Sequence, residues 1–208
     1  MKVGVIIPDR GDRPELLNHC LQMMRNQTRK PDVIEVVNYK SKSEDYDLTQ
    51  RVRNGFDKLK KECDCVLIVE NDDWYSCDYI NIMINAWDDM ARPDLLGTAY
   101  TYYYHVFKQV YRKIEHPRRA SLMNTLINCT ANIEWCADND VFLDLHLWKG
   151  LAGITITPTI PISIGIKHGI GLCGGSGHND MRYENKDINY KFLSEIVDED
   201  SLNLYKNL

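Results

Sequence analysis

Three short apolar runs alternate with segments of helical periodicity over the first 70 residues, and this alternation restricts the fold more than any other feature. The runs are residues 3–7, 33–37 and 65–69. Residues 3–7 are a continuous run rich in β-branched residues, which is typical of a strand buried on both faces of a sheet, and residues 33–37 and 65–69 are the next two strands expected. Between them, apolar residues recur at helical spacing, first after Pro14 and then from Leu48 to Leu59. This order predicts parallel βαβ units with right-handed crossovers, which form half of an open α/β sheet.

The second half of the chain has a more mixed pattern. A further helix is expected over residues 78–90, and the Thr, Tyr, Val and Phe of residues 98–111 favour a hairpin or extended strands. Residues 154–166 favour a strand. Residues 165–177 contain six glycines, a composition that is costly in backbone entropy unless the loop holds something. We therefore expect a ligand-binding loop or lid there.

Another helix is expected over residues 139–148. Asp138 stands where it could cap the amino end of this helix. Val141, Leu145 and Trp148 fall on one side of the helix and predict its buried stripe.

Composition limits the class of protein. With 208 residues, 44% of them hydrophobic and 26% charged, the chain is expected to form one globular domain over residues 1–208. A net charge of −5 argues against a dedicated nucleic-acid coat. The sequence contains neither an apolar stretch of membrane-spanning length nor a signal-peptide pattern, so we expect a cytoplasmic location. Seven scattered cysteines suit reduced thiols, and Cys63 and Cys65 are too closely spaced for a usual zinc site.

The most informative polar motif is the tetrapeptide that follows the third apolar run. Glu70, Asn71, Asp72 and Asp73 stand at the predicted carboxyl end of a buried strand, where open α/β sheets bind ligands. Carboxylates at this density repel one another, and a divalent cation would relieve the repulsion while holding an anionic ligand. The alternative is a polar turn or the cap of the next helix.

The order of these motifs resembles family 2 glycosyltransferases, which have the GT-A fold, a Rossmann-like, mostly parallel sheet with flanking helices. The resemblance rests on residues 3–8 ending in Pro8, on Arg13-Pro14, on Arg53-Asn54-Gly55, and on residues 66–73, which are similar to a strand leading into the family's DxD motif. It covers residues 3–90 well and the remainder thinly. It implies a nucleotide-sugar-binding half, 1–90, and an acceptor and catalytic half, 91–208.

The resemblance also implies functional residues. The donor nucleotide would be bound by Pro8, Arg10, Arg13, Asn38, Arg53, Asn54, Glu70 and Asn71. Mn²⁺ or Mg²⁺ would be held by Asp72, Glu70 and His168, and His178 is a second candidate histidine. Two positions depart from the pattern, because Asn38 stands where the family often has an acid and Glu70 replaces the first Asp of the DxD motif.

The family's catalytic base falls on Asp140, with Asp138 as the second candidate. In an inverting transfer, the base would take the proton of an acceptor hydroxyl as its oxygen attacks the anomeric carbon. The alternatives are that Asp138 caps the following helix and that Asp140 only favours its dipole.

The resemblance implies transfer of a sugar, expected to come from a UDP-sugar, to a saccharide or other hydroxyl acceptor with inversion. The rival functions are a non-catalytic nucleotide- or carbohydrate-binding module and an enzyme acting on modified bases in DNA. The tyrosines of residues 100–104 and the basic residues 112–119 could line an acceptor site, or could be a packed hairpin beside a solvated basic loop. The glycine spacing of residues 165–177 matches neither a P-loop nor a dinucleotide fingerprint, which argues against kinases and dehydrogenases.

Overall fold

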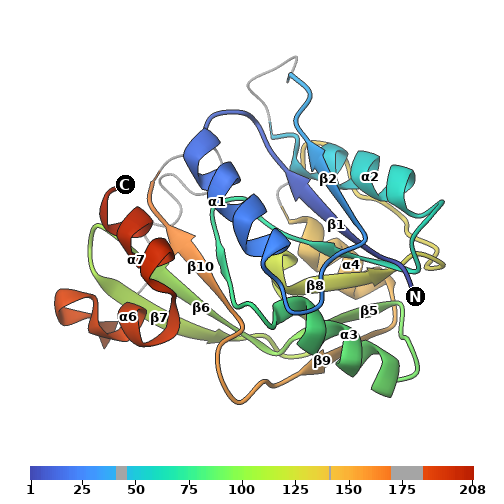
Figure 1. The fold of residues 1–208 in the computed structure, drawn as a ribbon. Coiled ribbons are helices and arrows are strands. Elements are labelled where there is room, and N and C mark those ends of the chain that lie inside the picture. The colour runs from blue at the N-terminus through green and yellow to red at the C-terminus, as the bar shows by residue number, and fades with distance from the viewer. Residues whose placement is uncertain (41–45, 141, 170–184) are drawn as a thin grey trace.

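A computed structural model describes residues 1–40, 46–140, 142–169 and 185–208 (Figure 1). The helices are α1 (Pro14–Arg25), α2 (Leu48–Leu59), α3 (Tyr79–Asp89), α4 (Leu143–Gly150), α6 (Lys191–Ile196) and α7 (Glu199–Lys206), with short 3₁₀ helices at Leu122–Asn124 and Ile188–Tyr190. The strands are β1 (Val3–Pro8), β2 (Val33–Val37), β3 (Cys65–Ile68), β4 (Trp74–Tyr75), β5 (Leu95–Thr98), β6 (Tyr100–His105), β7 (Val110–Glu115), β8 (Thr125–Asn128), β9 (Gly153–Ile156), β10 (Ser163–Lys167) and β11 (Asn185–Lys186).

The first sheet is the predicted parallel half with additional strands. Its order is β2-β1-β3-β8-β5-β9. Strand β1 pairs in parallel with both β2 and β3, and β8 runs antiparallel to its neighbours β3 and β5. Since β9 is parallel to β5, only β8 opposes the common direction. The ends of β1, β2 and β3 therefore meet at one edge, as the sequence predicted.

Helices cover both faces of this sheet and create two cores. One core joins alternate residues of β1 and β3 to α1, α3 and the C-terminal helices. The other joins the opposite faces of the same strands to α2 and α4. This two-sided burial explains why β1 and β3 are continuous apolar runs rather than alternating ones.

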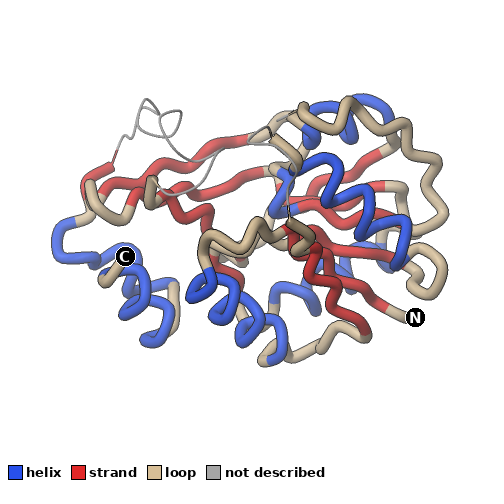
Figure 2. The backbone as a smooth tube through the Cα atoms, turned by 90° about the horizontal axis from the view of Figure 1, so that it is seen from above, coloured by secondary structure: helices blue, strands red, loops and turns tan. Residues whose placement is uncertain are grey.

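The second sheet lies beside the first, and α6 and α7 pack at the end of the molecule away from the N-terminus (Figures 1 and 2). Its order is β11-β7-β6-β10-β4. The expected hairpin is the antiparallel pair β6 and β7, in which Tyr103 lies opposite Arg112. Strand β10 is parallel to β6 and antiparallel to β4, which directly follows the acidic turn.

The predicted strand over residues 154–166 is wrong as a single element. It is two strands in different sheets, β9 in the first and β10 in the second. Pro158 and Pro161 lie between them, and because proline has no N–H to donate, the ladder stops there. Gly165 belongs to β10 rather than to a loop, and most of the glycine-rich segment, with His178, falls outside the described residues.

The predicted helix over residues 139–148 begins later than expected, at Leu143. Asp138 is therefore not its cap. The carboxylate of Asp140 instead accepts a hydrogen bond from the Phe142 N–H at 2.8 Å, which holds a turn ahead of the helix. The buried stripe contains Leu143, Leu147 and Trp148, whereas the side chain of Leu145 is 43% exposed. Val141 is outside the described residues.

No helix in the described parts of the chain has the length and apolar character needed to cross a membrane.

Candidate functional site

A buried arginine holds the ends of β1 and β2 together. Arg51, on α2, donates to the Asp9 and Val37 carbonyl oxygens at 2.6 and 2.8 Å and to the Tyr39 carbonyl at 3.0 Å. It also pairs with Asp47 at 2.8 Å, and its guanidinium lies 4.2 Å from the centre of the Tyr39 ring. These contacts supply hydrogen-bond donors to backbone carbonyl groups where the strands end. Arg51 therefore holds the backbone in place where β1 and β2 end.

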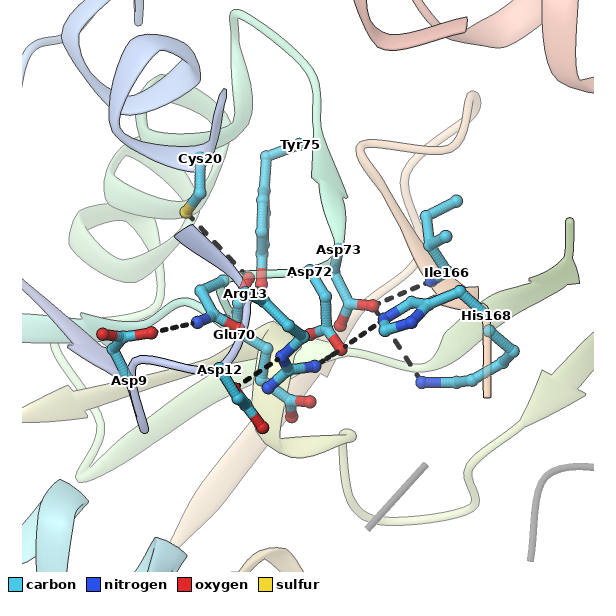
Figure 3. Close-up of polar contacts among 12 residues, drawn as sticks. Asp9, Asp12, Arg13, Cys20, Glu70, Asp72, Asp73, Tyr75, Ile166 and His168 are labelled. Atoms are coloured by element: carbon cyan, nitrogen blue, oxygen red, sulfur yellow. Dashed lines mark hydrogen bonds and ion pairs between the residues drawn. The ribbon is translucent and has the colours of Figure 1, made fainter. Parts of the chain in front are cut away.

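The acidic turn after β3 is the centre of the site (Figure 3). One carboxylate oxygen of Asp72 accepts from both the Arg13 guanidinium and the His168 Nε2, the latter at 3.0 Å. Burial alone would raise the pKa of Asp72, but the hydrogen bond from His168 and the charge of Arg13 hold it below its ordinary range. Asp72 is therefore an anion at neutral pH, and the predicted residues Arg13, Asp72 and His168 do lie together.

Asp73 contacts the second sheet through one carboxylate oxygen. Its Oδ1 accepts from the Ile166 N–H at 2.8 Å (Figure 3). Lys167 Nζ lies 4.0 Å from the same oxygen. Burial tends to lower the pKa of Lys167, but Asp73, Asp72 and Glu70 raise it above its ordinary value. The lysine is therefore a buried cation that offsets part of the negative charge of the turn.

Three carboxylates of this turn could hold a metal ion. Ligand oxygens of Glu70, Asp72 and Asp73 lie within 4.8 Å of one another. Asp73 Oδ2 is buried and has no hydrogen-bond partner, and burial raises the pKa of Glu70 to about 7. A bound cation would stabilise both the unpaired carboxylate oxygen of Asp73 and the ionised form of Glu70, and oxygen-only ligands suit Mg²⁺ or Mn²⁺. The residues present therefore fit the expected divalent cation.

The other residues predicted to bind the donor include Asn71, in this turn, and residues at the ends of β1 and β2. Asn71 is buried and donates to Asp9 Oδ1 at 2.7 Å, which links the turn to the end of β1. Pro8 is the buried last residue of β1, and Arg10 pairs with Asp47 at 3.0 Å. The side chain of Asn38 is exposed directly after β2.

Arg53 and Asp138, predicted for the donor and for catalysis, form an ion pair with each other. The distance between Arg53 Nη1 and Asp138 Oδ1 is 2.8 Å, and Arg53 Nη2 donates to Asp138 Oδ2 at 3.0 Å. Asn54, the next residue on α2, has an exposed side chain. The pair attaches α2 to the segment that carries both candidate bases.

Asp140, the other candidate base, is half-buried beside α2. Its backbone carbonyl accepts from Thr49 Oγ1 at 2.9 Å, and its Oδ2 lies 3.1 Å from His146 Nε2. The imidazole keeps one carboxylate oxygen oriented, as a second group orients a catalytic carboxylate or histidine in many enzymes.

The basic residues of segment 112–119 form only in part the solvated loop that the sequence allows. Arg112 and Lys113 lie within β7, and His116 is buried with its Nε2 3.2 Å from Thr101 Oγ1. Arg119 pairs with Asp144, on the first turn of α4, at 2.6 Å. Arg118 is exposed.

Lys167 and Arg51 were missed by sequence reasoning, although a weak signal existed for both. Each is a cation inside an otherwise apolar pattern, Lys167 at the end of β10 and Arg51 beside Val52 on the buried face of α2. A charged residue at such a position is buried only when it is paired.

Comparison with solved structures identifies the fold. A crystal structure of residues 1–349 of S. aureus TarS in complex with UDP-GlcNAc matches with a TM-score of 0.55 at 12% sequence identity, over 83% of this chain and 60% of that one. A second structure of TarS 1–349 matches with a TM-score of 0.51 at 14% identity, over 80% of this chain. The chain thus spans 60% of the length of these TarS chains. No protein-family model and no curated protein sequence matches it.

This likeness confirms the predicted fold class, a mixed α/β fold with sheets of mostly parallel strands and flanking helices.

Proposed function

We propose that this chain is a glycosyltransferase that moves a sugar from a UDP-sugar to a hydroxyl acceptor. The observation that carries the proposal is the group of three carboxylates, Arg13 and Lys167 at the end of β3, in a fold shared with a protein crystallised with UDP-GlcNAc. The strand ends are also where open α/β sheets bind nucleotides. Membership of family 2 and a cytoplasmic location remain predictions from the sequence.

The donor would lie across the ends of β1 and β3. Pro8, Asn38, Arg10, Arg53 and Asn54 surround the nucleoside side of this edge in the proposal, and Arg13 faces the diphosphate. Asp72 and Glu70, with His168 beside Asp72, would hold Mg²⁺ or Mn²⁺. When bound, the cation neutralises the diphosphate and the charge that develops on the leaving UDP.

Asp140 is the proposed base. The acceptor hydroxyl oxygen attacks the anomeric carbon, its proton passes to a carboxylate oxygen of Asp140, and the bond between that carbon and the diphosphate oxygen breaks. Attack on the face opposite the diphosphate inverts the configuration. His146, at 3.1 Å, would stabilise the orientation of the carboxylate.

The test is slow hydrolysis of the donor, in which water replaces the acceptor. The protein is incubated with UDP-sugars and Mn²⁺, and release of UDP is measured. We expect release by the wild type, its loss together with metal-dependent UDP binding in Asp72→Asn, and a decrease of about 10²- to 10⁴-fold in Asp140→Asn with UDP binding retained. Asp57→Asn, an exposed acid on α2, is the matched control and should behave as wild type.

Binding of UDP-sugars without turnover of any donor would identify a nucleotide-binding module and contradict the enzymatic proposal. Full activity of Asp72→Asn would contradict the role of the acidic turn.

A further inference from the structure

A second group of possible metal ligands lies outside the acidic turn, where the segment before α4 meets α2. It contains a thiol, a carboxylate and an imidazole, from Cys136, Asp140 and His146, and their ligand atoms all lie within 4.8 Å of one another. Asp140 Oδ2 and His146 Nε2 are 3.1 Å apart. This combination of donors differs from the oxygen-only group formed by Glu70, Asp72 and Asp73.

The spacing suits a small tetrahedral ion. Bonds of about 2.0–2.3 Å from zinc to nitrogen, oxygen and sulfur place neighbouring ligand atoms roughly 3.3–3.7 Å apart. The ligand atoms lie no more than 4.8 Å apart, with Asp140 Oδ2 and His146 Nε2 at 3.1 Å, which is close to this spacing.

Neighbouring groups already hold the ligands in place. The Phe142 N–H binds Asp140 Oδ1 at 2.8 Å, which leaves Oδ2 directed at His146. Thr49 is buried, donates to the Asp140 carbonyl at 2.9 Å and lies 3.6 Å from Cys136 Sγ. Such second contacts orient the ligands in established metal sites.

The group is also accessible. The His146 side chain is 50% exposed, and Cys136 and Asp140 are half-buried. An ion can therefore enter from solvent, and water can occupy a fourth position.

We infer that Cys136, Asp140 and His146 form a binding site for a zinc-class transition metal ion, with three protein ligands and one open position. Thiolate and imidazole donors select such ions, whereas the acidic turn suits Mg²⁺ or Mn²⁺. The two sites therefore differ in the metal that each prefers.

One consequence rests on the proposed function. A metal ion bound to Asp140 occupies the oxygen that would receive the acceptor proton. Zinc at this site would therefore inhibit transfer, although Mn²⁺ at the acidic turn supports it.

Cobalt is the probe for the binding site, because a thiolate bound to Co²⁺ gives a charge-transfer band in the near ultraviolet. The whole chain is stripped with chelator, titrated with Co²⁺ and then with Zn²⁺, and the bound metal is counted. We expect one equivalent of Co²⁺ with this band, displaced by Zn²⁺. Cys136→Ser should lose the band, and His146→Gln should bind at least tenfold more weakly.

Cys77→Ser is the matched control, since Cys77 is an exposed free cysteine outside the group, and it should keep the band. A wild type without the band, or a band that persists in Cys136→Ser, would overturn the inference. If Cys136→Ser fails to fold, His146→Gln decides the question, because its side chain is half-exposed and unchanged Co²⁺ affinity in this variant also overturns the site.

Zinc inhibition separates this inference from the proposed function. Micromolar Zn²⁺ should suppress UDP release by the wild type and leave release by Cys136→Ser unaffected. Equal inhibition of both proteins would mean that Zn²⁺ acts at the acidic turn, and it would contradict inhibition by Zn²⁺ bound to Asp140. Absence of UDP release under all conditions would count against the proposed function, whereas the cobalt titration would still decide the metal site.

Discussion

Neighbouring charges give the acids of the turn after β3 different properties, although they are chemically alike. Asp72 lies between Arg13 and His168, and its pKa is held below the ordinary range. Glu70 lacks such a close pair, and burial raises its pKa to about 7 despite the charge of Lys167. The sequence placed both residues at the end of a strand. It did not contain the information that separates them, because Lys167 and His168 arrive from a strand about 95 residues away.

His116 is predicted to make the protein sensitive to acid. It is buried, and burial together with the charge of Arg119 lowers its pKa to about 4, from an ordinary 6.5. Between these values the unfolded chain binds a proton that the folded chain does not, so the free energy of unfolding falls as the pH decreases from 6.5 to 4. At pH 4 this loss amounts to about 2–3 kcal/mol.

The variant His116→Gln cannot bind that proton. Urea unfolding at several pH values measures the free energy of unfolding of both proteins. Between pH 7 and pH 4 this free energy should fall less in the variant, and above pH 7 it should change with pH equally in both proteins. If the free energy of unfolding fell equally with pH in both proteins over the acid range, the environment of His116 would have no effect on its protonation.

The contact between α2 and the first sheet depends on a glycine. A Cβ added at Gly55 would lie 2.7 Å from Ile6 Cγ2 and 3.1 Å from Val37 Cγ2. Both neighbours are buried β-branched residues, Ile6 on β1 and Val37 on β2, and they have little freedom to move. Gly55 therefore lets α2 approach the sheet closely enough for Arg51 to reach the strand ends.

Gly55→Ala should lower the free energy of unfolding by about 1–3 kcal/mol, although alanine favours helices over glycine by about 1 kcal/mol. Gly150→Ala is the matched control at the end of α4, where an added Cβ has no neighbour within 4 Å. Chemical denaturation measures both. An equally stable or more stable Gly55→Ala would show that the helix can shift without cost.

At the scale of the whole molecule, the last helix, α7, returns to contact β4 and α1. Asp198 caps α7 by accepting from the Ser201 N–H at 2.9 Å, and its other oxygen accepts from Trp74 Nε1 at 3.1 Å. Trp74 directly follows the acidic turn. Ser201 Oγ also lies 2.8 Å from His19 Nε2 on α1. These side-chain hydrogen bonds therefore attach α7 to both α1 and β4.

Asp198→Ala removes both the cap and the bond to Trp74, and should lower the free energy of unfolding by about 1–3 kcal/mol at neutral pH. Burial by itself raises the pKa of Asp198, but its hydrogen bonds to Ser201 and Trp74 lower it below the ordinary 3.8. The stabilisation is thus present above pH 3.8 and is lost as the pH falls below it. Asp198→Asn keeps one acceptor oxygen, which can still accept from the Ser201 N–H, and should therefore lose less stability than Asp198→Ala. Equal stability of Asp198→Ala and the wild type would mean that α7 is held by apolar contacts alone.

The sequence by itself determined the parallel core of the fold and the position of its acidic turn. Local patterns were sufficient for this, since burial on both faces makes β1 and β3 apolar throughout and the helical spacing of α1 and α2 is set by the sheet that they cover. The tertiary structure alone decided which groups surround the turn. Strand β10 joins the second sheet because prolines separate it from β9, and it thereby brings Lys167 and His168 to Asp73 and Asp72. Likewise, the late start of α4 decides that Asp140 faces His146 and Cys136, because contacts between distant segments leave no periodic signal in the sequence.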